Sequence, residues 1–471
     1  MERNAEYYAQ GLARLIQIPT VVTEPPEIFE RYHERLKEVF PHVFDTVEIT
    51  KAGASDAEGD IFLQMAKRIG GISDPRFQSA NPKGGNALIL KWKGKSGEKP
   101  IALMGHQDVA PVEEKNWTYP PFEGRIVDGK LYGRGAIDCK NTAYLSLQAI
   151  EELIEEGFVP EHDVYFLSSD NEEMAGQGTP SSIKILKERG VHFSIIIDEG
   201  GAISTDLFAA LKKPVAAVAV MEKGSSVFRF SAKSHGGHTS MPPKNTPWER
   251  LARLIVDVHS HRYFKPKVTP EVVAMLEGLS DAMGGPAKFL LKHAKWFKPL
   301  IQVAAPKINP TVNAMLSTVI TFTMCEGSTL PNVIPNEAFI IANLRHSTHS
   351  NVAYAQKIFA RLSKKYDVDV ELVFGYDATV PVTVDNPGYR YVAQTIKEVL
   401  PDTAIVPFIQ TGGTDSRHTP EIADAALRFT PFRISANQMG RMHGDDENID
   451  VATLPEGVTF FKQLIRNYKG V

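Results

Sequence analysis

Short apolar runs alternate with longer amphipathic segments in the first half of the chain. Each short run has the length of a buried strand, and the longer segments repeat their apolar residues at helical spacing. Thr179 followed by Pro180 is also typical of a helix start. The pattern predicts strands at 86–92, 101–104, 164–167 and 193–197 and helices at 142–156 and 181–189. Strands that alternate with helices in this way predict an α/β fold with a mostly parallel sheet.

The pattern changes near Glu222. From there the expected order is strand, helix, strand, strand, helix, strand, at 226–232, 248–258, 319–324, 338–344, 352–364 and 368–374. This βαββαβ order is that of a ferredoxin-like unit. We therefore predict a large domain, residues 1–221 and 377–471, with a smaller domain, residues 222–376, inserted into it. Inside the insert, residues 269–316 are rich in Ala, Leu, Met, Phe and Lys and predict two or three additional helices.

The composition is that of an ordinary globular protein. The 471 residues are 43% hydrophobic and 23% charged, which suits two or three domains with a sizeable core. The 52 basic and 56 acidic side chains give a net charge of −4. This charge offers no general attraction for nucleic acid or an anionic membrane, although local positive patches stay open. The two cysteines, Cys139 and Cys325, are too few for a disulfide framework or a four-thiolate zinc site.

The amino-terminal segment, Met1 to Thr20, carries charged residues and lacks the apolar block of a signal peptide. Elsewhere the most apolar stretches fall short of the roughly 18–20 residues that a membrane helix needs. We therefore expect a cytoplasmic protein with no membrane span and no nucleic-acid partner.

Acidic and histidine residues follow several of the predicted strands. His106 and Asp108 come directly after the strand at 101–104, where a metal ligand and the carboxylate that orients it would both fit. Alone, the pair is equally explained as a solvated loop. Asp138 follows a glycine-rich turn just before a predicted helix, and alone it reads most simply as a helix N-cap.

Two adjacent pairs of acids follow the next strands. Glu172 and Glu173 come after the strand at 164–167, and Asp198 and Glu199 end the strand at 193–197. Neighbouring carboxylates are common in exposed loops. They can also take two different roles at a metal site, since one can bind a cation while the other polarises the water bound to it. His443 lies near the carboxyl terminus. Any one of these sites alone is adequately explained as structural.

Taken as a set, these residues point to a metal site. The carboxyl ends of strands in an open α/β sheet face one crevice, so coincidence becomes the poorer explanation. Nitrogen and oxygen donors without thiols suit Zn²⁺, and Mn²⁺ and Co²⁺ accept the same donors. Two ions about 3.5–4 Å apart would activate water and polarise a carbonyl. The sequence therefore predicts a metal-dependent hydrolase.

Seven sequence motifs also carry a family resemblance over nearly the whole chain, namely GHQDV, GRGAIDCKN, NEEMAGQG, IIDEGG, SHGGHTSMPP, NVIPNEA and TGGTDSR. They resemble the zinc-dependent metallopeptidase and amidohydrolase family of carboxypeptidase S, aminoacylase, carnosinase and succinyl-diaminopimelate desuccinylase. The carboxypeptidase S and N-acyl-amino-acid hydrolase branch is the most similar. The resemblance implies a di-zinc catalytic domain and an inserted lid that also forms a homodimer or higher oligomer. This chain departs from the branch at Cys139, where a second Asp is usual.

The resemblance assigns the metal site residue by residue. It implies that two zinc ions are bound by two histidines and several acids, with Asp138 bridging, and that either Asp198 or Glu199 is a ligand. Glu172 would be the general base, and Asp108 would orient the first histidine. The implied ligands are His106, Asp138, Glu173, Asp198 or Glu199, and His443.

Four further residues match positions near the substrate. His238 matches a lid histidine that stabilises the oxyanion and that the partner subunit supplies in several relatives; alone, it also fits a surface histidine in a glycine-rich turn. Arg345 and Arg417 match positions near the substrate carboxylate, a role that suits guanidinium groups. Asn332 matches a substrate-facing loop. For these last three residues an ordinary surface or turn role is equally open.

The resemblance implies cleavage of the amide bond between an acyl group and an amino acid with a free carboxylate. Synthesis by the reverse reaction stays open. A dipeptidase of the same family is the alternative, and a non-catalytic scaffold with this fold is a remote one. The apolar residues of 269–316 either line an acyl channel or pack in the core or a dimer interface.

Overall fold

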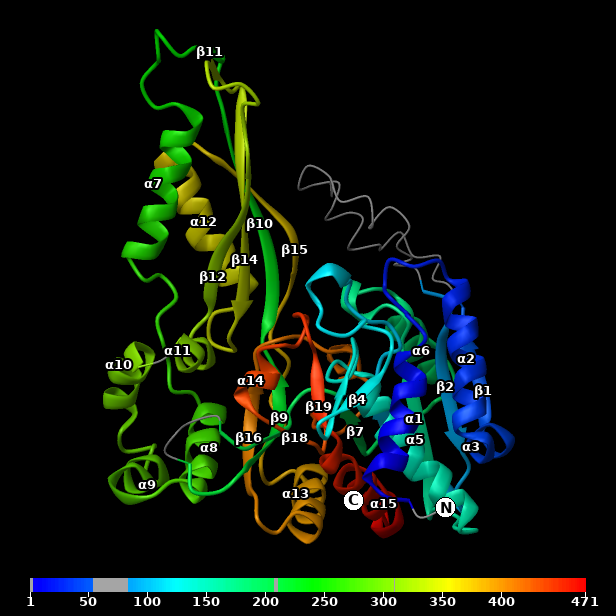
Figure 1. Cartoon of the computed structure of the whole chain (residues 1–471). Coiled ribbons are helices and arrows are strands. Elements are labelled where there is room, and N and C mark those ends of the chain that lie inside the picture. Colours follow the sequence, from blue (N-terminus) through cyan, green and yellow to red (C-terminus); the bar gives the residue numbers. More distant parts are fainter. Residues whose placement is uncertain (1–2, 54–83, 207–210, 309) are drawn as a thin grey trace.

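The computed structural model describes residues 3–53, 84–206, 211–308 and 310–471 (Figure 1). The predicted large domain therefore includes residues 1–2, 54–83 and 207–210, which lie outside the described residues, and the predicted helical stretch includes residue 309.

The large domain is organised around one mixed sheet whose central strands are parallel. Its centre has the order β6 (His162–Ser168), β3 (Ser96–Met104), β7 (Ile195–Asp198) and β17 (Ala426–Arg428). The predicted α/β class is confirmed, and the predicted strands are present with slightly different ends. Antiparallel pairings extend this centre on both sides, and beyond them β16 pairs in parallel with β9 and β18 in parallel with β8. These outer strands are β1 (Glu48–Ala52), β2 (Ala87–Trp92), β8 (Ile203–Ser204), β9 (Val215–Glu222), β16 (Ala404–Gln410) and β18 (Arg433–Ile434).

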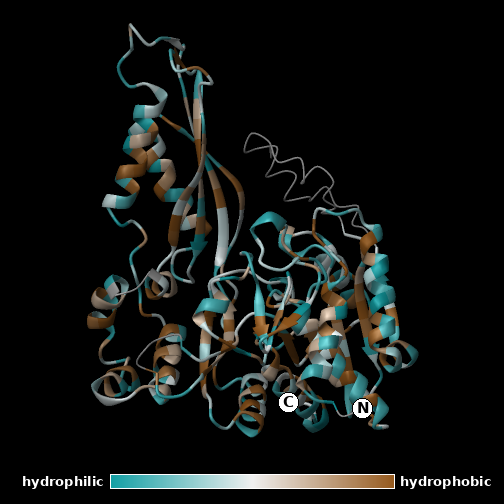
Figure 2. Cartoon of the chain, in the orientation of Figure 1, coloured by the Kyte–Doolittle hydropathy of each residue, from teal (hydrophilic) through white to brown (hydrophobic). Residues whose placement is uncertain are grey.

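Helices cover both faces of this sheet, which is why its central strands are continuously apolar (Figure 2). One face is covered by α1 (Ala5–Ile16), α5 (Lys140–Glu155), α13 (Pro387–Val399) and α15 (Leu454–Asn467). The other face packs against α6 (Gly178–Glu188). Helix α6 begins three residues before the predicted start at 181. Thr179 and Pro180 therefore lie in its first turn, where the missing proline N–H needs no helical acceptor.

The remaining elements of the large domain are short. Helices α2 (Glu27–Val39) and α3 (Pro41–Thr46) lie near the amino terminus. A small three-stranded sheet and α14 complete this part, with strands β4 (Arg125–Val127), β5 (Lys130–Tyr132) and β19 (Asn448–Asp450) and helix α14 (Ala436–Met439). None of the helices in the described residues has both the length and the apolar character required to cross a bilayer.

The inserted unit has the predicted βαββαβ order. Its antiparallel sheet has the order β12 (Val319–Glu326), β14 (Glu337–His346), β10 (Gly224–Lys233) and β15 (Asp369–Tyr376). Helices α7 (Pro247–Ser260) and α12 (Val352–Tyr366) pack on it around a separate apolar core. Figure 1 shows this unit extending away from the large sheet, with the short strands β11 (Gly237–His238) and β13 (Val333–Ile334) at its far tip.

The stretch 269–316 forms four α-helices, more than predicted. They are α8 (Pro270–Leu279), α9 (Gly285–Lys292), α10 (Lys298–Ile308) and α11 (Pro310–Leu316). Met275, Leu276 and Ile301 belong to the core of the large domain, and a Cβ on Gly278 would lie 2.9 Å from Pro407 of β16. These helices therefore pack on the large sheet although they interrupt the insert. This supports core packing, not an acyl channel, for their buried side chains.

Candidate metal centre

Three neighbouring strands carry acidic and histidine residues to one edge of the large sheet. His106 lies two residues beyond β3, Glu172 and Glu173 lie in the 3₁₀ turn η3 (Glu172–Met174) after β6, and Glu199 directly follows β7. Since β6, β3 and β7 are parallel neighbours, their carboxyl ends lie side by side. This is the common edge that the sequence predicted.

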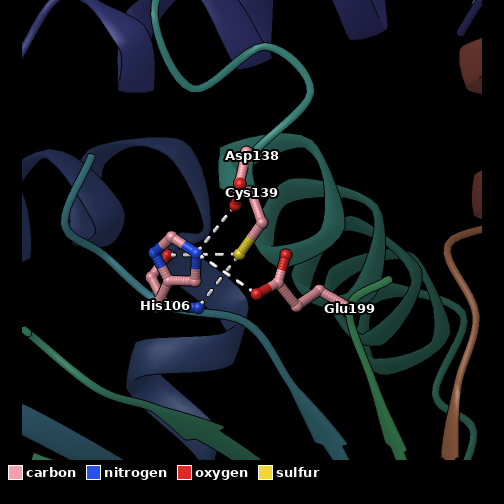
Figure 3. A group of neighbouring side chains, drawn as sticks. All are labelled: His106, Asp138, Cys139 and Glu199. Atoms are coloured by element: carbon pink, nitrogen blue, oxygen red, sulfur yellow. Dashed lines mark hydrogen bonds and ion pairs between the residues drawn. The ribbon is translucent and has the colours of Figure 1, made fainter. Parts of the chain in front are cut away.

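His106 is the centre of the first group of potential ligands (Figure 3). Its buried ring donates from Nε2 to Asp138 Oδ1 at 2.9 Å, and Glu199 Oε1 lies 3.3 Å from the same nitrogen. On the other side of the ring, Nδ1 donates to the carbonyl oxygen of Asp108 at 2.8 Å. The sulfur of Cys139 completes the group and accepts the backbone N–H of His106 at 3.1 Å.

Asp138 joins this group to a second one. Its other oxygen, Oδ2, accepts a hydrogen bond from His443 Nε2 at 3.0 Å, and Glu173 Oε2 lies 3.2 Å from that nitrogen. His443 is held in a left-handed backbone conformation with φ of 59° and keeps about half of its side chain exposed. One carboxylate therefore faces two histidines, and each histidine also faces a second acid.

Asp108 contacts the His106 ring with both its carbonyl oxygen and its carboxylate, as expected for a residue that orients this ring. The carbonyl oxygen makes the closer contact, since Oδ1 is 3.4 Å from Nδ1. The carboxylate oxygens also accept the backbone N–H groups of Glu172 and Glu173, each at 3.0 Å. Asp108 thus orients the histidine and holds the turn that carries the two acids.

The structure distinguishes Asp198 from Glu199. Both oxygens of Asp198 accept backbone N–H groups, from Glu199 at 2.8 Å and from Ser416 at 2.7 Å, and its side chain is buried. Only Glu199 faces His106. Side chains of adjacent residues in extended backbone point in opposite directions, and this alternation separates a structural acid from a candidate ligand.

Glu447 is a further residue at this site that the sequence reasoning missed. It is fully buried, pairs with Arg134 at 2.6 Å and accepts the backbone N–H groups of Gly135, Ile137 and Asp138. It therefore fixes the turn that carries Asp138. Arg134 also donates to the carbonyl oxygen of Gly444, next to His443. The only sequence signal is an acid in a charged run, which by itself is typical of a solvated loop.

Burial and crowding change the charge states of these groups. Burial raises the pKa of Glu172, Glu173 and Glu199, and neighbouring acids such as Asp138 raise it further for Glu173 and Glu199. Hydrogen bonds to Asp138 and Glu173 raise the pKa of His443 to about 11. Burial opposes a charge on His106, yet the surrounding negative groups hold its pKa well above its usual value.

The donors fit divalent metal ions. Acids crowded into a buried site are mutually repulsive, and the two protonated histidines supply the positive charge that metal ions would otherwise supply. Glu173 Oε1 is buried and, within the described residues, accepts no hydrogen bond. Such an orphaned oxygen is expected where a cation binds. His106, Asp138 and Glu199 would hold one ion, and Asp138, Glu173 and His443 another.

Glu172 lies beside these groups with one of the predicted arginines. Arg417, in the turn η5 (Asp415–His418), places Nη1 3.4 Å from Glu172 Oε1, and its guanidinium carbon lies 5.7 Å from the centre of the Tyr376 ring. Arg345, on β14 of the insert, is aligned with Ser225 of β10, and Ser225 is aligned with Tyr376 on its other side. The two arginines therefore flank the junction between the two units.

His238 and Asn332 lie far from this centre within the same chain. His238 is paired with Val333 across β11 and β13, and Thr239 donates its backbone N–H to the carbonyl oxygen of Asn332. Both His238 and Asn332 are exposed. Figure 1 shows β11, which carries His238, at the tip of the insert, away from the large sheet, and Asn332 directly precedes β13, the strand that pairs with β11. The structure brings these two residues together, but not to the metal centre.

Comparison with known proteins identifies the family. The model of peptidase family M20/M25/M40 matches residues 102–467, which include every residue of the two groups. The chain belongs to this family. The M20 fold is also seen in solved structures. A metallo-carboxypeptidase of this family from Sulfolobus solfataricus, Sso-CP2, has a TM-score of 0.68 at 15% identity and covers 99% of both chains. Human carnosine dipeptidase 1 has a TM-score of 0.65 at 15% identity and covers 98% of this chain and 95% of its own.

Among relatives in sequence, the human N-fatty-acyl-amino acid synthase/hydrolase PM20D1 is 32% identical over 78% of this chain and 74% of its own length. Carboxypeptidase S of Saccharomyces cerevisiae is 24% identical over 97% of this chain and 83% of its own. The predicted resemblance to the branch of carboxypeptidase S and N-acyl-amino-acid hydrolases is confirmed. The M20 chain is thus a hydrolase of the metallopeptidase type, as its sequence predicted.

Proposed function

We propose that this M20 chain is a di-zinc amidohydrolase that cleaves the bond between an acyl group and an amino acid with a free carboxylate. The observation that carries the proposal is the position of Asp138, whose two oxygens face two histidines that each contact a further acid. A single carboxylate shared by two donor groups suits a pair of ions. The names of the relatives, an N-fatty-acyl-amino acid synthase/hydrolase and a carboxypeptidase S, support the substrate class.

The residues around the centre have distinct roles in the proposed reaction. Bound zinc would acidify a water molecule and polarise the carbonyl group of the substrate. Glu172 would accept a proton from the attacking water and return it to the leaving amine, because it lies beside the ligands without contacting either histidine. Burial also raises the pKa of Glu172, which makes this carboxylate a stronger proton acceptor.

Recognition of the substrate carboxylate would fall to the two arginines. Arg417 of the large domain lies over the Tyr376 ring, and Arg345 of the insert is aligned with Tyr376 through Ser225 of the strand between them, so a carboxylate between the two arginines would be bound at the junction of the two units. His238 and Asn332 would reach a substrate from the lid tip. We propose that a second copy of the chain supplies them, through a homodimer formed by residues 222–376.

Metal analysis and a substrate panel test this function together. Purified protein is analysed by mass spectrometry for zinc, manganese and cobalt, and we expect close to two equivalents of zinc. Hydrolysis is then compared for N-acetyl, N-lauroyl and dipeptide substrates that share one carboxyl-terminal amino acid. We expect the N-acyl compounds to be cleaved faster than the dipeptides.

Each other outcome contradicts part of the proposal. Faster cleavage of dipeptides would identify a dipeptidase of the same family. Absence of both metal and hydrolysis would identify a scaffold protein. Incubation of the free fatty acid with the amino acid, followed by mass spectrometry of the product, tests the synthetic direction. The cytoplasmic location stays a prediction.

A further inference from the structure

Four large apolar side chains are exposed on the outer face of the helices that follow α8. They are Phe289 on α9, Trp296 in the turn after it, and Leu300 and Val303 on α10, with exposed fractions of 58%, 74%, 55% and 64%. Figure 1 shows α9 and α10 at the edge of the molecule, on the side of the large domain away from α1 and α2. These residues take no part in the metal centre, and exposed apolar groups of this size call for an explanation.

We call these four exposed side chains the apolar face. The rings of Phe289 and His293 lie 4.7 Å apart, and the rings of His293 and Trp296 are stacked, 4.7 Å apart at an angle of 8°. Leu300 and Val303 are three residues apart and share one side of α10. Figure 2 shows the hydrophobic colouring of α10 at the edge of the molecule.

The segment that carries the apolar face is positively charged. Between residues 282 and 325 the sequence has no Asp or Glu, whereas the chain as a whole carries a net charge of −4. Five lysines lie in the same segment, and Lys212 lies against it at Gly284. None of the five is paired with a carboxylate in the part of the chain that the structure describes. They are Lys288, Lys292, Lys295, Lys298 and Lys307.

We propose that α9, α10 and the turn between them bind the surface of an anionic lipid bilayer. Apolar and aromatic side chains beside unpaired lysines are the combination that lies in a membrane interface, with the rings among the acyl chains and the ammonium groups at the phosphates. Tryptophan in particular favours this interface. The binding is peripheral, consistent with the lack of a spanning helix in the described residues.

A second copy of the chain fits this surface less well. A twofold interface would place the five lysines of one chain against the same five lysines of the other, and like charges repel. The membrane proposal also stands independently of the proposed acyl substrate, because the lysines and the apolar face lie outside the metal centre.

Flotation with lipid vesicles tests the proposal on the full-length metal-loaded protein. We expect binding to vesicles of phosphatidylcholine with 30% phosphatidylglycerol, which have roughly the charge density of an anionic membrane surface. This binding should weaken as the salt concentration is raised. Vesicles of phosphatidylcholine alone should bind little protein. Replacing two lysines, Lys292→Gln with Lys295→Gln, should weaken the partition coefficient about 25-fold, at about fivefold for each charge. Phe289→Ser with Trp296→Ser should reduce binding by at least about tenfold through lost apolar contact.

Controls keep the result specific to this surface. Trp248→Ser changes another exposed tryptophan, 38% exposed on α7, and should leave vesicle binding unchanged. All these variants should hydrolyse a short, water-soluble N-acyl amino acid at the rate of the unchanged protein. The fluorescence of Trp296 should shift to shorter wavelength with anionic vesicles, and this shift should disappear in Trp296→Phe.

Two outcomes would overturn the proposal. One is vesicle binding that survives both double variants, which would place the contact elsewhere. The other is absence of vesicle binding with a change of oligomeric state in Phe289→Ser with Trp296→Ser, measured by light scattering. That result would make the apolar face an interface between copies of the chain. Failure of the substrate panel would leave the vesicle result unaffected.

Discussion

The metal centre and the tip of the lid are built in opposite ways. In the metal centre, backbone N–H groups hold the acid-bearing turns through Asp108 and Glu447, and His106 is buried among its partners. At the lid tip, His238 is exposed and its ring contacts only Ser240, two residues away, among the described side chains. The centre is held by buried hydrogen bonds, whereas the tip is exposed, as the substrate contact that we propose for His238 requires.

This difference separates two tasks of a hydrolase. Groups that bind metal must be fixed before substrate arrives, because reorganising charges during the reaction raises its barrier. A group that contacts the developing oxyanion must instead leave an entry path and close later. Substitutions in the metal centre should therefore abolish hydrolysis or metal binding. Substitutions at the tip should lower only the rate of hydrolysis after the lid has closed, and leave the metal content unchanged.

The largest expected effect is at Glu172. Glu172→Gln removes the proton acceptor while keeping the shape of the side chain, so we expect hydrolysis to fall by about 10²–10⁴-fold. Zinc content, measured by mass spectrometry, should be unchanged, because Glu172 contacts Arg417 and neither histidine.

Glu173→Gln provides the matched control for its neighbour. It removes a charge from the oxygen that faces His443, so here zinc content should fall as well. Equal metal loss in both variants would contradict the division of roles between the two acids.

His238 should show the next largest effect. Loss of one oxyanion contact costs about 10²–10³-fold in kcat, so His238→Ala should be slow but fully loaded with zinc. If a second copy supplies this histidine, mixing His238→Ala with Glu172→Gln should restore activity. Random exchange makes half of the dimers mixed with one complete site each, hence about a quarter of the original activity.

The mixing experiment also has a clear negative result. No recovery, with subunit exchange shown by native mass spectrometry, would mean that the lid closes on its own chain. Full activity of His238→Ala alone would remove the lid tip from the reaction altogether.

Metal binding by the centre should depend on pH. The pKa of His443 is raised to about 11 and that of His106 is also raised, so both are protonated at neutral pH in the protein without metal. Zinc must displace these protons, so acid weakens binding and alkali strengthens it, by up to about tenfold per pH unit for each proton released. Calorimetry at one pH in two buffers of different ionisation enthalpy counts the protons.

We expect at least about two protons in total, one from each histidine, and any further proton would come from Glu173 or Glu199, whose pKa burial raises. His238→Ala, outside the centre, should release the same number. His443→Ala should release one fewer. A proton count below one for the unchanged protein would contradict the charge states inferred for the two histidines.

Local patterns were enough to predict the strands of the large sheet, the βαββαβ order of the insert and the edge of the sheet where the acids gather. Strand periodicity and the acids that follow each strand are short-range features, so His106, Glu173 and Glu199 were found as candidates from the sequence. The contacts that hold them depend on residues far apart in the chain. Glu447 binds the turn at Asp138 across more than 300 positions, and no local pattern marks such a contact.

The same limit explains the other differences. The choice between Asp198 and Glu199 depends on the backbone N–H of Ser416, which only the folded chain brings near. The helices at 269–316 interrupt the insert in sequence but pack against β16 of the large sheet, because their apolar side chains complete that core. Composition alone predicted helices there without indicating the surface that they cover.

The smallest expected effect is at Cys139, where the family resemblance implies a second Asp. The thiol accepts the backbone N–H of His106 at 3.1 Å and donates to its carbonyl oxygen at 3.7 Å, so it acts on the backbone behind the ring. A hydroxyl makes the same two hydrogen bonds, so Cys139→Ser should change kcat/KM by less than about tenfold. Cys139→Ala, which makes neither, should lose more. If sulfur were instead a ligand, the cobalt-loaded protein would show a strong near-ultraviolet thiolate band that Cys139→Ser removes. This outcome would make Cys139 a metal ligand and not only a residue that supports the ligands.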